Sequence, residues 1–96
     1  MSRQKIIWAP SALADLKSIH EYVLQDSEAR ASALIREIIH GVEKLARFEN
    51  LGRVIPEIGQ SRYRQLIFGE YRIFHEVRDR EVFIFRVLHS KQLFFH

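Results

Sequence analysis

The stretch that decides the fold is RYRQLIF (residues 62–68), GE (69–70) and YRIFHEV (71–77). Both outer runs are rich in aromatic and β-branched residues, which favour β-strands. The Gly-Glu pair between them suits a two-residue type II′ turn, because glycine at the first central position tolerates a positive φ. The sequence therefore predicts an antiparallel β-hairpin.

Upstream of this hairpin, the chain has the pattern of one strand and two helices. Arg3–Trp8 is short and rich in β-branched and aromatic residues, and it ends where Pro10 forces its predecessor into extended geometry. Apolar residues then recur at intervals of three and four from Leu13 to Leu24, and again from Ala31 to Leu45. Since only a short break separates these segments, we expect an antiparallel helical hairpin.

Four residues refine this interpretation of the helices. Ser11 is expected to cap the first helix, and Asp26 or Ser27 the second. Asp15 is expected to be favourable in the first turn of its helix. Gly41 interrupts the second apolar stripe, which suggests a close approach to the first helix.

Downstream, the prediction is completed by a loop and a third strand. Residues 50–61 contain two glycines and a proline without periodicity, which indicates a loop of about a dozen residues. Residues 81–88 are strand-like and follow a turn at 78–80. The expected fold is a single α+β domain over residues 1–96, in the order β-α-α-β-β-β, with one sheet and the helices on one face.

The two faces of the predicted sheet differ. One face carries mostly aliphatic residues, and we assign it to the helices. The other interleaves aromatic and polar side chains: Tyr63, Gln65, Ile67, Arg72, Phe74, Glu76, Phe83 and Phe85. Two helices can cover only one face, so the aromatic face is expected to be a partner surface that nothing else in the chain covers. Two alternatives stay open: residues 92–96 fold back over it, or a β-bulge re-aims some of its side chains.

Composition narrows the functional classes. The chain has 96 residues, no cysteine and a net charge of +3, with the excess of cations in residues 53–96. The absence of cysteine favours an intracellular, cytoplasmic protein without disulfides. No apolar run is long enough to span a bilayer, and no signal peptide is recognisable.

The chemistry-bearing residues are arginines and histidines. The histidines are scattered without ligand spacing, so neither a metal site nor a cofactor is expected. A basic set remains on the predicted sheet and the loop before it: Arg53, Arg62, Arg64, Arg72, Arg86, His89 and Lys91. Such a set can stabilise a phosphorane in a metal-independent nuclease, or grip a phosphate backbone or an acidic protein surface.

Short motifs along nearly the whole chain resemble the RelE/ParE superfamily of toxins from type II toxin–antitoxin systems. The resemblance rests on Trp8, Ala14-Asp15-Leu16, Ile19 and Tyr22, then on Gly52-Arg53, Pro56-Glu57, Arg62, Tyr71-Arg72-Ile73 and Val87-Leu88-His89. It implies a toxin that is neutralised by a cognate antitoxin, ParD-like or other. The residues then expected to bind the antitoxin are Tyr63, Phe74, Phe83, Phe85, Leu93, Phe94 and Phe95.

The resemblance implies one of two activities. RelE-like members cut mRNA on the ribosome with basic residues of the sheet, whereas ParE-like members poison DNA gyrase. Arg72 matches the RelE-like arginine, but Tyr63 and Gln65 replace lysines and Gln92 stands where a second arginine is expected. This depletion favours a ParE-like gyrase inhibitor without enzymatic activity.

Two alternatives to gyrase inhibition stay open. A ribosome-dependent mRNA endonuclease would use Arg72 and His89 as its catalytic residues. A non-catalytic protein-binding module would use the sheet only for docking. In each case Arg53, Arg62, Arg64, Arg86 and Lys91 are the expected contacts to the target.

Overall fold

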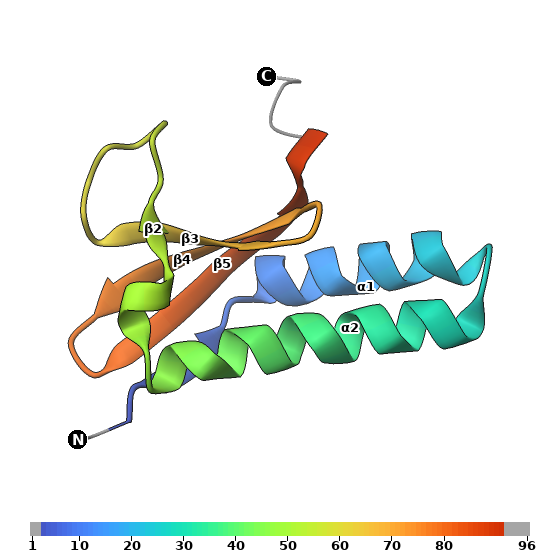
Figure 1. Cartoon of the computed structure of the whole chain (residues 1–96), viewed down its shortest axis with the longest axis horizontal. Coiled ribbons are helices and arrows are strands. Elements are labelled where there is room, and N and C mark those ends of the chain that lie inside the picture. Colours follow the sequence, from blue (N-terminus) through green and yellow to red (C-terminus); the bar gives the residue numbers. More distant parts are fainter. Residues whose placement is uncertain (1–2, 92–96) are drawn as a thin grey trace.

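The computed structural model describes residues 3–91 as two helices packed on one five-stranded sheet (Figure 1). The sheet order is β1-β5-β4-β3-β2; β1 runs parallel to β5, and the other neighbours are antiparallel. The elements are β1 (Lys5–Trp8), α1 (Pro10–Leu24), α2 (Glu28–Glu43), β2 (Arg53–Val54), β3 (Tyr63–Phe68), β4 (Tyr71–Arg78) and β5 (Glu81–His89), with 3₁₀ turns η1 (Lys44–Ala46) and η2 (Glu49–Leu51).

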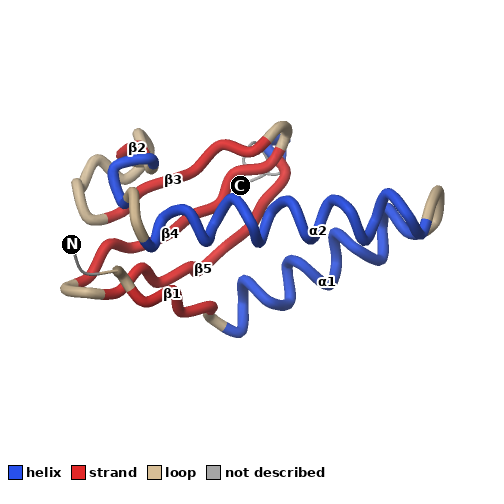
Figure 2. Tube along the Cα trace, turned by 60° about the horizontal axis from the view of Figure 1, so that its bottom comes forward, coloured by secondary structure: helices blue, strands red, loops and turns tan. Residues whose placement is uncertain are grey.

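Both helices lie on the same face of the sheet (Figure 2). Their buried side chains meet those of β4 and β5 in a single core cluster, which contains Ala12, Leu16, Ile38, Val42, Leu45, Ile73, Val82, Ile84 and Val87. The α+β architecture and the assignment of the aliphatic face to the helices are therefore confirmed.

The expected element order needs one correction. Residues 50–61 are not all loop, because Arg53 and Val54 form β2, which pairs with Gln65 and Arg64 of β3. A two-residue strand is too short to show an alternating pattern, so periodicity cannot reveal it. The sheet consequently has five strands, with β2 at the edge opposite β1.

The caps of the two helices follow the prediction in one case only. Ser27 caps α2 by accepting a hydrogen bond from the backbone N–H of Arg30 at 3.2 Å. Ser11 does not cap α1: the N-cap is Ala9, and Pro10 occupies the first helical turn, where its missing N–H costs nothing. The hydroxyl of Ser11 instead donates to the backbone carbonyl of Phe85 at 2.7 Å.

Helix α1 covers the edge of β5 that β1 leaves unpaired. The parallel pairing of β1 ends at Trp8 and Ile84, and α1 starts two residues after Trp8. Asp15 lies outside the first turn, contrary to expectation, and its carboxylate accepts from the backbone N–H of Val87 at 2.8 Å. Because unpaired strand edges invite wrong pairing, this contact protects β5 as well as fixing α1.

The turn at Gly69-Glu70 forms as the sequence predicts, whereas Gly41 has a different neighbour from the one expected. Gly69 has a φ of 58° and Glu70 a negative one, as a type II′ turn requires. Gly41 does not face α1; a Cβ there would meet the ring of Phe68 on β3 at 3.7 Å. No helix within residues 3–91 is long and apolar enough to cross a membrane.

Candidate partner-binding face

The side of the sheet away from the helices, here called the far face, carries the aromatic residues assigned to it from the sequence. Phe85 lies in a β-bulge, since Phe74 pairs with Arg86 and His75 with Ile84. The bulge does not turn the ring away: Phe85 contacts Tyr63 edge-on, with centroids 6.2 Å apart, and Phe74 at 6.1 Å. The far face therefore has a continuous aromatic cluster.

This cluster is not bare, and that corrects the expectation that nothing in the chain covers it. Three arginines of the same surface lie over three rings: Arg62 over Tyr63 at 4.9 Å, Arg72 over Phe74 at 4.9 Å, and Arg78 over Phe83 at 4.2 Å. Phe74 is consequently only 9% exposed, whereas the aliphatic Ile67 beside it is 51% exposed. A guanidinium over a ring adds a cation–π attraction while it shields the ring from water.

Arg72 is the most extensively bonded residue described on the far face, because each nitrogen of its guanidinium donates a hydrogen bond. Its Nε donates to Gln65, and its two Nη atoms donate to the carboxylate of Glu57 at 3.0 and 3.1 Å. The side chain of Arg72 is 13% exposed, but that of Glu57 is 59% exposed. The hydrogen bond from Arg72 holds the pKa of Glu57 below its ordinary value.

Glu57 reaches Arg72 because the loop between β2 and β3 is fixed at its base. Arg64, expected to contact a target, donates from Nε to the carbonyl of Ser61 at 2.8 Å and from Nη1 to that of Gly52 at 3.1 Å. Gly52 packs so tightly that a Cβ would lie 2.5 Å from Nε2 of His75. The guanidinium of Arg64 thus joins both ends of this loop.

The ring of His75 packs against Gly52 and is fully buried. Its Nδ1 lies 3.3 Å from the carbonyl of Ile73, and its Nε2 has no hydrogen-bond partner among residues 3–91. Burial lowers the pKa of His75, and the nearby charge of Arg64 lowers it further, against the opposing bond to Ile73. His75 is therefore neutral at pH 7 and acts in packing.

The two residues expected to be catalytic in a nuclease are not brought together. Arg72 lies on the far face, whereas His89 pairs across the strands with Tyr71, whose ring it contacts at 5.4 Å on the helix side of the sheet. There His89 lines a cavity of about 480 Å³ with Ser18, Ile19, Tyr22, Tyr71 and Lys91. Its Nε2 lies 3.7 Å from a carboxylate oxygen of Glu70.

The other expected target contacts differ in their surroundings. Arg86 is paired with Asp15, at 2.8 Å between Nε and Oδ2, and this bond raises the pKa of Arg86. Arg53, Arg62 and Lys91 are exposed. Leu93, Phe94 and Phe95 lie outside the described residues, and the described part of the chain has no cluster of potential metal ligands.

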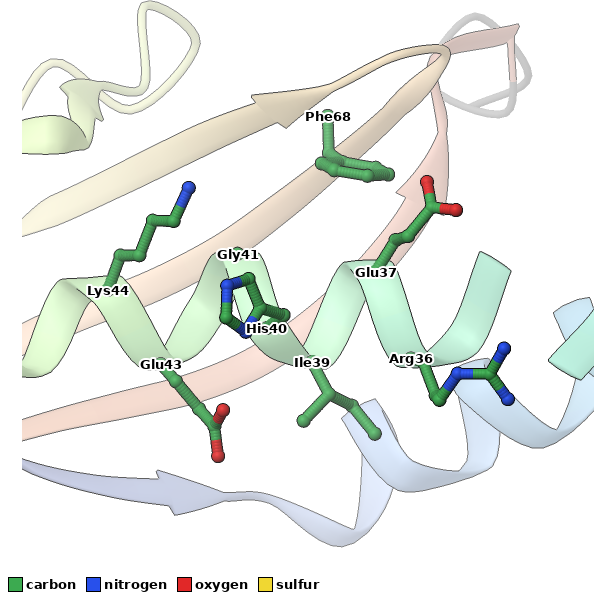
Figure 3. A pocket seen from close by; sticks show the side chains of 8 residues that line it. All are labelled: Arg36, Glu37, Ile39, His40, Gly41, Glu43, Lys44 and Phe68. Carbon is green, nitrogen blue, oxygen red and sulfur yellow. The ribbon is translucent and has the colours of Figure 1, made fainter. Parts of the chain in front are cut away.

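A separate groove of about 570 Å³ runs between α2 and β3 (Figure 3). Gly41 and Phe68 lie close together in its lining, which also includes the charged side chains of Arg36, Glu37 and Lys44. None of the expected site residues lines this groove, so it is distinct from the far face.

Comparison with known proteins assigns the fold and the family. Among solved structures, the chain is similar to a chromosomal ParDE toxin–antitoxin system from P. aeruginosa, with a TM-score of 0.76, 23% identity, and coverage of 91% of this chain and 96% of that one. It is also similar to a RelBE toxin–antitoxin complex from Mycobacterium tuberculosis (TM-score 0.70, 17% identity, 93% of each chain). A RelB–RelE complex from Methanococcus jannaschii gives a TM-score of 0.63 at 24% identity, covering 92% and 94%.

These similarities at low identity establish the fold alone. No curated protein sequence matches the chain significantly. Residues 6–94, however, match the family model described as the ParE toxin of the type II toxin–antitoxin system parDE. Since this match spans nearly the whole sequence, the chain belongs to the ParE toxin family of type II toxin–antitoxin systems.

Proposed function

We propose that this toxin inhibits DNA gyrase and is neutralised by a cognate antitoxin that covers the far face. The observation that carries the choice of target is the separation of Arg72 and His89 by the thickness of the sheet. Phosphoryl transfer needs its charge-stabilising and proton-transferring groups within reach of one phosphate. A nuclease resting on these two residues is therefore poorly supported, and binding remains the simpler mode of action.

A second observation supports inhibition without catalysis. Arg72, the far-face arginine of the Tyr-Arg-Ile motif, already donates to Glu57 and Gln65. Tyr63 and Gln65 beside it provide no further cation. The far face thus has little unneutralised positive charge with which to stabilise a pentavalent phosphate.

The antitoxin part of the proposal is supported by the relatives. The solved structures from M. tuberculosis and M. jannaschii are described as toxin–antitoxin complexes. In this chain, Ile67 is exposed beside half-buried rings. A partner with apolar side chains would remove this surface from water.

The test is a gyrase supercoiling assay with the purified toxin. Inhibition or trapped cleaved DNA is expected at roughly micromolar toxin, a concentration typical of a specific but modest complex. The product of the adjacent short open reading frame should relieve the inhibition when mixed with the toxin beforehand. In parallel, translating ribosomes with a defined mRNA are the control: mRNA cleavage together with unaffected gyrase would refute the proposed target.

A further inference from the structure

The pair formed by Arg72 and Glu57 is unequal, and this inequality suggests an exchangeable contact. Arg72 is held from several sides, by the Phe74 ring beneath it and the Gln65 amide beside it. Glu57, in contrast, is mostly exposed on the loop between β2 and β3, and Arg72 is the partner whose hydrogen bond lowers its pKa. Removal of Glu57 would therefore leave the arginine fork in place and open to solvent.

We infer that Arg72 is a docking site for a carboxylate of the partner protein, and that Glu57 is a built-in competitor which occupies it in the free toxin. The inference rests on the proposed neutralisation by an antitoxin and adds how one of its acidic side chains would be recognised. A guanidinium fork binds carboxylates through two parallel hydrogen bonds. Glu57 already demonstrates this geometry, since each of its oxygens accepts from a different Nη atom.

The surroundings of Arg72 define the chemistry of the partner segment. Ile67 lies directly across the strands from Arg72 and is 51% exposed, so apolar residues should flank the partner's carboxylate. The surface as a whole has Arg53, Arg62, Arg72, Arg78 and Arg86 against Glu57, Glu76, Glu81 and the Asp15 that pairs with Arg86. This slight positive excess fits a short acidic and apolar polypeptide, whereas a nucleic acid backbone calls for several unpaired cations.

The effect of Glu57 on the affinity of Arg72 for a partner's carboxylate is large enough to measure. An exposed carboxylate–arginine pair contributes modestly, on the order of 0.2–1 kcal/mol, which corresponds to a factor of about 1.4 to five in an equilibrium. An incoming carboxylate must overcome this factor before it binds. Glu57→Ala should therefore strengthen binding of an acidic peptide about 1.4- to five-fold.

The experiment compares variants with two probes, a fluorescein-labelled peptide of alternating glutamate and leucine and a fluorescein-labelled oligothymidylate. Glu57→Ala should bind the peptide more tightly than the wild type, and Arg72→Gln and Arg72→Lys should lose this binding because neither retains the fork. Glu76→Ala is the matched control, because it frees Arg78, which also has a carboxylate partner and a ring beneath it but is bonded through Nε alone and lacks the two-pronged contact of Arg72. Its peptide affinity should stay unchanged.

Three outcomes would overturn the inference. The first is equal peptide binding by the wild type and Glu57→Ala, and the second is an equal gain from Glu76→Ala. The third is a gain confined to the oligothymidylate, which would make a nucleic acid phosphate the ligand. Thermal melts of each variant check the fold. Because gyrase is absent from this assay, a failure of the proposed gyrase target would leave its result unaffected.

Discussion

Asp15 offers the sharpest test of how the fold is held, because one carboxylate joins α1 to the open edge of β5. Its Oδ2 accepts from the backbone N–H of Val87 at 2.8 Å and from Nε of Arg86 at 2.8 Å, and Oδ1 accepts from Nη2 at 3.1 Å. A hydrogen bond to a charged group contributes about 1.5–3 kcal/mol. The ion pair adds less than about 1 kcal/mol, because the side chain of Arg86 is 45% exposed.

Asp15→Ala should therefore lower the free energy of unfolding by roughly 2–3 kcal/mol, or the melting temperature by roughly 10–20 °C. Asp15→Asn keeps an acceptor for Val87 and should lose only about 1 kcal/mol. The measurement is urea unfolding followed by circular dichroism. Glu21→Ala, an exposed carboxylate on the same helix, is the control and should stay within about 0.5 kcal/mol of the wild type. A similarly small effect of Asp15→Ala, or equal losses from Ala and Asn, would refute the edge contact.

Three further predictions concern packing and pH. Gly52→Ala should lower the free energy of unfolding by about 1–3 kcal/mol, because its Cβ would collide with His75. Gly41→Ala, where a Cβ has room, should instead stabilise α2 by about 0.5–1 kcal/mol. Urea midpoints that move in the same direction for both variants would contradict these predictions. The pKa of His75 is lowered in the folded protein, so the unfolded chain takes up a proton first as the pH falls through about 6.5. The contribution of neutral His75 to the free energy of unfolding is therefore complete above that pH. Below it, this contribution declines by up to about 1.4 kcal/mol per pH unit. His75→Phe should flatten the decline between pH 7 and pH 5.5, and an unchanged slope of urea midpoint against pH would assign it to other groups. Phe74→Ala should lower the free energy of unfolding by about 3 kcal/mol or more, and Ile67→Ala by less than about 1 kcal/mol, because Phe74 is buried and Ile67 is exposed. If Ile67→Ala lowered the melting temperature more than Phe74→Ala, Phe74 would lie at the surface.

The sequence was sufficient for the elements whose pattern is local. The strands on both sides of Gly69-Glu70 alternate with a period of two, and both helices show apolar stripes, so their positions and the helix-bearing face were predictable. The strand Arg53–Val54 escaped because pairing with β3, rather than any pattern of its own, makes it a strand. Ser11 was misassigned for a similar reason, since its partner, Phe85, is 74 residues away.

The organisation of the far face was only half predictable. Which residues share this face follows from strand alternation, and the stacking of Arg72 on Phe74 could have been foreseen, because residues two apart on a strand lie side by side. The pairing of Arg72 with Glu57 could not, because it depends on how a loop of irregular backbone returns over the sheet. His89 illustrates the same limit, as its spacing along the chain did not reveal that it faces away from Arg72.

If the antitoxin binds the far face, as proposed, the arginine-covered rings would let this surface suit both the free and the bound toxin. The guanidinium groups of Arg62 and Arg78, which lie over half-buried rings, each contribute on the order of 0.5–1 kcal/mol, enough to shield the ring but little enough for a partner to displace. A partner that offers carboxylates to the arginines and apolar side chains to the rings replaces both interactions at once. Phe74, at 9% exposure, would then serve mainly as the fixed support of Arg72, while Ile67 and the half-buried rings of Phe83 and Phe85 would gain the new contacts. Specificity for the antitoxin would accordingly depend on the position of its acidic residue relative to its apolar ones, since Arg72 and Ile67 are fixed neighbours in the sheet.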